Sequence, residues 1–62
     1  MSKMKAFIER LVENRETVLV NVPGSGYVHA RVESIQEDIV TIDPEKGSKI
    51  ILHYTQFSVK LE

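Results

Sequence analysis

Tyrosine, histidine and arginine occupy alternate positions on one short stretch of the chain, at Tyr27, His29 and Arg31. Because side chains two residues apart lie on the same face of a β-strand, this spacing predicts a stripe that carries all three. An aromatic ring can stack on a nucleotide base, and an arginine can neutralise a phosphate. The stripe therefore has the chemistry of a single-stranded nucleic-acid site. The alternative interpretation is the ordinary solvent-facing side of a strand.

A second histidine, His53, lies within the apolar stretch "IILHY" at positions 50–54. Strand alternation places Ile51 and His53 on one face and Leu52 on the other, together with Ile50 and Tyr54. Two interpretations stay open for His53: a polar residue with a structural role in an apolar strand, or a group that faces a ligand.

The chain of 62 residues is expected to form a single domain over residues 1–62. A domain this small buries only about 60% of the surface that its unfolded chain exposes. Small folds compensate with disulfides, a metal or association, but this chain has no cysteine and its two histidines are far apart in sequence. We therefore expect no metal and no cofactor, and we expect association with further copies of the chain.

The formal net charge of −1, with a pI near 6.1, argues against a strongly basic surface that binds nucleic acid by charge alone. No apolar run is long enough to cross a membrane, and the N-terminus lacks a secretory pattern, so a cytoplasmic location is the default expectation. The chain has no cysteine nucleophile, no glycine-rich phosphate loop and no paired acid–base motif. We therefore expect that it is not an enzyme.

The spacing of apolar residues predicts one helix over residues 2–14, with Ser2 as its N-cap. From residue 17 the apolar period changes to two, and turn sequences such as "PGSG" at 23–26 separate the segments. In the second segment the alternation predicts that Ile35 faces outward. The fold class expected is mainly β with one N-terminal helix, as a small, five-stranded, bent antiparallel barrel over residues 16–61. The predicted strands cover residues 17–22, 27–35, 39–42, 49–54 and 57–61.

Two of these strands, "IVTI" at 39–42 and "KIILHY" at 49–54, are apolar on both faces. A single barrel has one packed interior, so the second apolar face needs a cover. Another subunit can provide this cover and can also protect an exposed strand edge. A head-to-tail contact of this kind closes into a ring when its rotation allows.

A helix followed by five strands, with a long bent second strand, resembles the Sm/LSm proteins and is most similar to the bacterial Hfq group. The matching pieces are "FIERLVENRETVLV" at 7–20, "VES" at 32–34 and His53, and the spacing from Glu33 and Ser34 to His53 equals that of Hfq. The resemblance implies a homo-oligomeric ring, a hexamer joined through the fourth and fifth strands, that binds single-stranded RNA on several surfaces. Another small SH3-like barrel remains the alternative fold.

The resemblance assigns candidate RNA-binding roles to particular residues. His53 corresponds to a histidine at the inner rim of the ring, and Asn21 stands where the family stacks bases on an aromatic residue. Tyr27 and His29 fall on second-strand contact positions, which Arg31 extends. Arg10 and Arg15 are the candidates for the arginine cluster at the outer rim.

Other positions depart from the Hfq pattern on the pore side. The stacking aromatic residue is replaced by Asp38, and the phosphate-binding lysine is replaced by Leu52. Carboxylates repeated around a ring would repel phosphate, so the resemblance predicts an RNA-binding protein with altered or weakened sites. The alternative function is an Sm-like scaffold or protein-interaction module that does not bind RNA.

Overall fold

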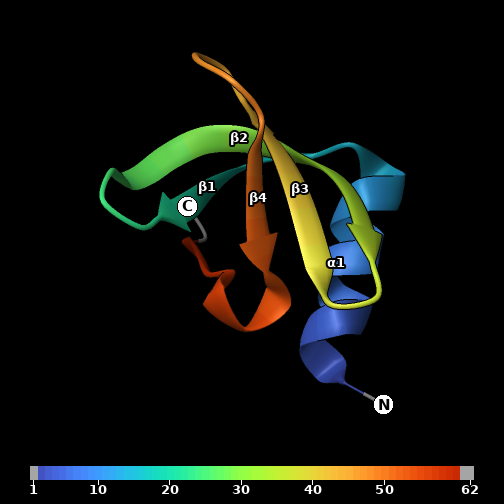
Figure 1. Cartoon of the computed structure of the whole chain (residues 1–62). Helices are drawn as coiled ribbons and strands as arrows, with labels where there is room; N and C mark the ends of the chain where they lie inside the picture. The colour runs from blue at the N-terminus through green and yellow to red at the C-terminus, as the bar shows by residue number, and fades with distance from the viewer. Residues whose placement is uncertain (1, 61–62) are drawn as a thin grey trace.

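The structure is a computed structural model that describes residues 2–60. One N-terminal helix precedes an antiparallel sheet of five strands in the order β4-β3-β2-β1-β5. Figure 1 shows α1 and the first four strands. The predicted mainly-β architecture with one N-terminal helix is confirmed. The elements are α1 (Lys3–Asn14), β1 (Thr17–Val22), β2 (Gly26–Gln36), β3 (Ile39–Pro44), β4 (Ile50–His53), the 3-10 turn η1 (Tyr54–Gln56) and β5 (Val59–Lys60).

Helix α1 begins and ends as its sequence predicts. The Ser2 side chain accepts a hydrogen bond from the backbone N–H of Lys5 at 3.4 Å, which caps the first turn. Arg15 ends the helix in the left-handed conformation, with φ 53°. Ile8 and Leu11 are the buried residues of the helix and dock it on the sheet. Within the described part of the chain, no helix has the length and apolar character needed to span a membrane.

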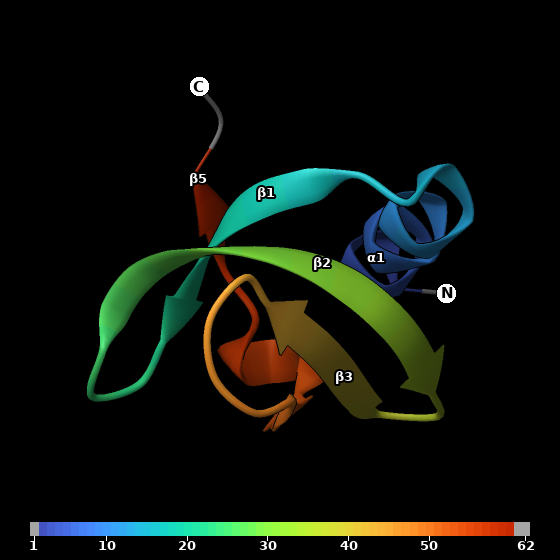
Figure 2. The same cartoon turned by 90° about the horizontal axis from the view of Figure 1, so that it is seen from above.

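Strand β2 is the longest strand and bends around the molecule (Figure 2). Its pairing with β3 shifts register between Val32 and Ser34, so that Glu33 is an extra residue without a partner on β3. Such a bulge bends a strand and reverses the alternation of the residues that follow it. Ile35 consequently packs against the core, and the prediction that it faces outward is wrong.

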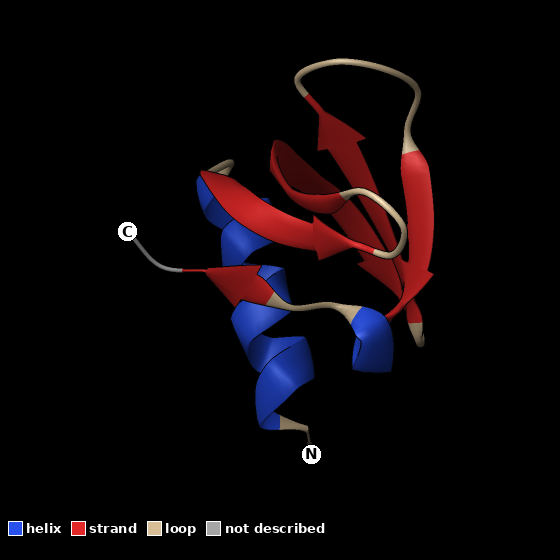
Figure 3. Ribbon diagram, turned by 90° about the vertical axis from the view of Figure 1, so that its left-hand side faces the viewer, coloured by secondary structure: helices blue, strands red, loops and turns tan. Residues whose placement is uncertain are grey.

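The sheet is not closed into a barrel by hydrogen bonds, because β4 and β5 lie at its two edges. The η1 turn follows β4 and redirects the chain, and β5 then pairs with β1 (Figure 3). Strand β4 is shorter than the strand predicted at 49–54, because Tyr54 begins this turn. The last strand begins at Val59 rather than at residue 57, and its predicted end at residue 61 lies outside the described residues.

The core lies between α1 and the inward faces of the strands, and all of its buried residues are apolar. Val20 in β1 and Val40 and Ile42 in β3 are completely inaccessible to solvent. Among the described residues, no polar or charged residue is buried. The buried residues are Ile8, Leu11, Val20, Val22, Ala30, Val32, Val40, Ile42, Leu52 and Phe57.

Candidate nucleic-acid interface

The outward face of β1 and β2 carries the predicted stripe. Tyr27, His29 and Arg31 are all exposed, while Val28 between them is partly buried and Ala30 is fully buried. The predicted alternation of this stripe is therefore confirmed, and the structure places Asn21 beside Tyr27 on the same face. The register pairs that build this face are Asn21–Tyr27, Leu19–His29 and Thr17–Arg31.

Arg15 and Arg31 line one hollow of about 380 Å³, although they come from the end of α1 and the middle of β2. The Arg31 guanidinium lies 3.8 Å from the Asp43 carboxylate, so its charge is partly balanced. Glu33 also borders the hollow and pairs with Lys49 at 2.7 Å, and this hydrogen bond raises the pKa of Lys49. The structure thus brings together Arg15 and Arg31, which the sequence assigns to separate surfaces. Acidic and basic side chains both surround this hollow.

His29 borders a second hollow, of about 300 Å³, between β2 and the loop after β3. The backbone N–H of Glu45 donates to the carbonyl oxygen of His29 at 3.0 Å and fixes the start of this loop against β2. Lys46 supplies a cation at the rim, beside the apolar surface of Val28 and Pro44. The hollow therefore places an apolar surface next to the stripe, and a flat ring can pack on this surface.

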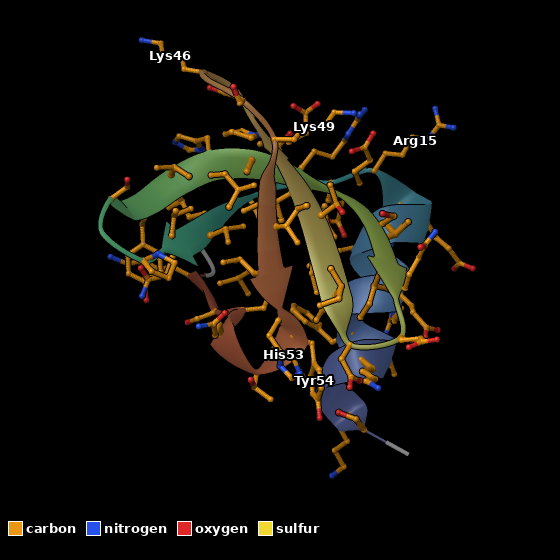
Figure 4. The ribbon with its side chains drawn as sticks, in the orientation of Figure 1. Arg15, Lys46, Lys49, His53 and Tyr54 are labelled. Atoms are coloured by element: carbon orange, nitrogen blue, oxygen red, sulfur yellow. The ribbon has the colours of Figure 1, made fainter. Side chains whose placement is uncertain are left out.

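His53 lies apart from this face. It pairs with Ile39 at the start of β3 and lies at the other end of β4 from Lys49, as Figure 4 shows. Its Nδ1 accepts the backbone N–H of Thr55 at 3.2 Å and lies 2.7 Å from the Thr55 hydroxyl, so the ring caps η1. Its Nε2 lies 3.9 Å from the Asp38 carboxylate. The contacts of His53 are those of a structural residue at a turn.

Asp38 is held by a lysine from the helix. Lys5 forms an ion pair with Asp38, and this hydrogen bond raises the pKa of Lys5 and lowers the pKa of Asp38. The Lys5 ammonium also lies 4.8 Å from the centre of the Tyr54 ring, and the Tyr54 backbone N–H donates to the Asp38 carbonyl at 2.8 Å. The contact joins the helix, the β2–β3 turn and η1, and it gives Asp38 a structural partner.

The other positions that the sequence singles out lie on α1 and β4, away from the stripe on β2. Arg10 is exposed on α1 and does not line the hollow that Arg15 and Arg31 share. Leu52, at the position of the family's lysine, is 6% exposed and belongs to the core. Ile51 points outward with 68% of its surface exposed, which confirms the predicted alternation of β4.

Lys60 also lies on the outward face, although no sequence motif identified it as a candidate. Its Nζ lies 5.9 Å from the centre of the Tyr27 ring, because β5 pairs with β1 on the side away from β2. Strand alternation around Val59 was the available signal, since it places Lys60 on the face opposite to the core. Within residues 2–60, no three histidine or acidic side chains converge to hold a metal.

None of the protein-family models, curated proteins or solved structures compared with the chain matches it. The resemblance to the Sm/LSm proteins rests on the N-terminal helix and the five antiparallel strands. This topology is compatible with an Sm-like fold.

Proposed function

We propose that the chain is an Sm-like, homo-oligomeric protein that binds single-stranded RNA on the outward face of β1 and β2. The observation that carries this proposal is the exposure of Tyr27, His29 and Arg31 side by side on that face. A base can stack on the tyrosine while an arginine and a histidine contact the phosphate and the polar edges of the base. Arg15 extends the positive charge into the neighbouring hollow.

On the pore side, the residues support a weakened RNA site. His53 caps η1, Asp38 adds a carboxylate beside it, and Leu52 is a core residue. None of these three offers the aromatic surface or the lysine that Hfq proteins use there. The proposal therefore assigns RNA binding to the outward face of β1 and β2.

The proposed assembly is a ring in which β4 of one subunit pairs with β5 of the next. Both strands are sheet edges whose backbone hydrogen-bonding groups on the outer side have no partner strand within residues 2–60. Ile51 on β4 and Ile39 on β3 are 68% and 44% exposed, and they form an apolar surface that a neighbour would cover. Six subunits would follow the Hfq pattern.

The proposal is tested by fluorescence anisotropy with short labelled oligo(A) and oligo(U) at about 50 and 200 mM salt. We expect micromolar or tighter binding that weakens with salt, a loss in Tyr27→Ala, and a smaller effect in Tyr27→Phe, which keeps the ring. Arg31→Gln should weaken binding, whereas Lys3→Gln, which removes the same charge from the start of α1, should not. Absence of salt-dependent binding to both oligonucleotides would reject RNA binding.

A scaffold that assembles without binding RNA is the second candidate function. The observation that favours it is the exposed apolar pair Ile39 and Ile51, which serves assembly regardless of RNA. The net charge of −1 points the same way. A ring that forms in solution and binds neither oligonucleotide would support the scaffold, whereas tight RNA binding that is lost in Tyr27→Ala would exclude it.

A further inference from the structure

Lys60 is brought to the outward face of β1 and β2 by the pairing of the last described strand with the first. In β5, Lys60 lies opposite Leu19 of β1, and Leu19 lies opposite His29 of β2 on its other side. The three residues form one row across the sheet, and strand alternation puts all three on the outward side. The half-buried Leu19 side chain supplies the apolar floor between the two polar neighbours.

The side chain of Lys60 reaches diagonally across β1 toward Tyr27. Its ammonium lies 5.9 Å from the ring centre, near the outer limit of about 6 Å for a cation–π contact. Tyr27 is 49% exposed and Lys60 is also exposed, so neither side chain is locked by packing. A ligand can therefore reach the ring and the ammonium together, and the contact holds the lysine nearby before the ligand arrives.

We propose that Lys60 is a nucleic-acid-binding residue that neutralises a phosphate of a single strand whose base stacks on Tyr27. The inference rests on the proposed function of this face and adds to the face a residue from β5, which is distant in sequence from β2. A nucleotide joins a flat aromatic base to a phosphate anion, and the face presents an aromatic ring beside a cation. The positive charge of Arg31 is partly balanced by the Asp43 carboxylate at 3.8 Å, so Arg31 is less available to a phosphate.

The experiment compares the salt dependence of oligo(U) and oligo(A) binding in the wild type, Lys60→Gln and Lys60→Arg. Each phosphate neutralised on a single strand contributes about 0.7 to the slope of log K against log salt. We expect Lys60→Gln to lower that slope by about 0.7 for each subunit that the strand contacts. The affinity lost between about 50 and 200 mM salt would then shrink by roughly 2.5-fold per subunit. Lys60→Arg should keep the wild-type slope.

Lys3→Gln is the matched control, because it removes the same charge at the start of α1, on the other side of the molecule from β5 in Figure 2. Its slope should equal that of the wild type. If the wild type binds and Lys60→Gln keeps both its slope and its affinity, the role of Lys60 is overturned while the proposed function stands. If the wild type binds neither oligonucleotide, both proposals fall, and a protein partner for this face becomes the better interpretation.

Discussion

Lys5 forms an ion pair with Asp38 and so ties the first turn of α1 to the turn between β2 and β3. The pair lies beside Tyr54, whose ring faces the Lys5 ammonium and whose backbone N–H is bound to Asp38. The pairing shifts both groups in the directions that favour their charged forms, since the pKa of Asp38 is lowered and the pKa of Lys5 is raised. The stability of the fold therefore depends on pH at both extremes.

The first prediction concerns acid. The pKa of Asp38 in the folded chain lies below its ordinary value of 3.8, so its contribution to stability is complete above that value. It is lost as the pH falls through the lowered pKa, because protonation removes the charge that binds Lys5. The Lys5 contribution is complete below 10.5 and is lost as the pH rises through its raised pKa.

Thermal unfolding of Asp38→Asn between pH 2 and pH 8 checks this prediction. The variant should be less stable than the wild type near neutrality, and the difference should shrink as the pH falls through the lowered pKa of Asp38. The effect should be small, because Asp38 is exposed, Lys5 is partly exposed, and solvent screens the pair. Glu37→Gln is the control, since its carboxylate is absent from the ion pairs described. A stability difference between Asp38→Asn and the wild type that does not shrink as the pH falls from 8 to 2 would contradict the assigned cause.

The second prediction concerns the core residue Ile42, which is completely buried in β3. Replacement by alanine removes buried methyl groups and leaves a cavity, so Ile42→Ala should cost about 2–5 kcal/mol of unfolding free energy. Ile39→Ala on the same strand is a matched control, because that side chain is 44% exposed and should cost less. Urea unfolding at one low protein concentration measures both, and equal losses would contradict the packing described.

Much of the fold follows from local patterns in the sequence. The cap at Ser2, the helical spacing of Ile8 and Leu11, and the alternation from Tyr27 to Arg31 all act between near neighbours, and the structure agrees with each. The alternation fails at Ile35 because the extra residue in β2 depends on its register with β3. A register between two strands is a property of the pair, and one strand's sequence does not contain it.

The candidate site, like the fold, was predictable from the sequence only in its local features. The stripe at Tyr27, His29 and Arg31 is local and could be predicted from its spacing. Its meeting with Arg15 depends on where α1 ends relative to β2, and its meeting with Lys60 depends on the pairing of β5 with β1. Such contacts join segments distant in sequence, and neither composition nor periodicity predicts them.

The third prediction concerns the β2–β3 turn, where Glu37 has φ 54°. Gln36 and Ile39 pair across a two-residue loop, and the positive φ of its first residue, Glu37, is a conformation that favours glycine. A left-handed conformation costs an ordinary residue about 1–2 kcal/mol. A glycine variant avoids this cost, but the greater entropy of its unfolded chain offsets part of the gain in stability. Glu37→Gly should therefore stabilise the fold by roughly 0.5–1 kcal/mol.

In a chain of this size, such a gain raises the melting temperature by about 2–8 °C. Glu45→Gly is the control for the turn, because it makes the same exchange in an exposed loop residue whose φ is not positive. That variant should leave the melting temperature unchanged or lower it. A decrease in Glu37→Gly as large as the decrease in Glu45→Gly would show that the turn is not strained.

The last prediction concerns assembly through Ile51, which is 68% exposed on the edge strand β4. If a neighbouring subunit covers this side chain, burial contributes about 1.5–3 kcal/mol, and an aspartate there would be buried as an unpaired charge. Ile51→Asp should therefore weaken each subunit contact by at least about tenfold. Sedimentation at tens of micromolar should show the wild type as a multiple of 7.1 kDa and the variant shifted toward that mass.

Met4→Asp is the control for Ile51→Asp, because Met4 is 40% exposed and lies on the helix α1 rather than on a strand of the sheet. It should assemble as the wild type does. A wild-type protein that sediments only at 7.1 kDa would refute assembly altogether. Unchanged assembly of Ile51→Asp would instead move the contact away from β4, because no interface that buries this side chain tolerates an unpaired carboxylate without loss.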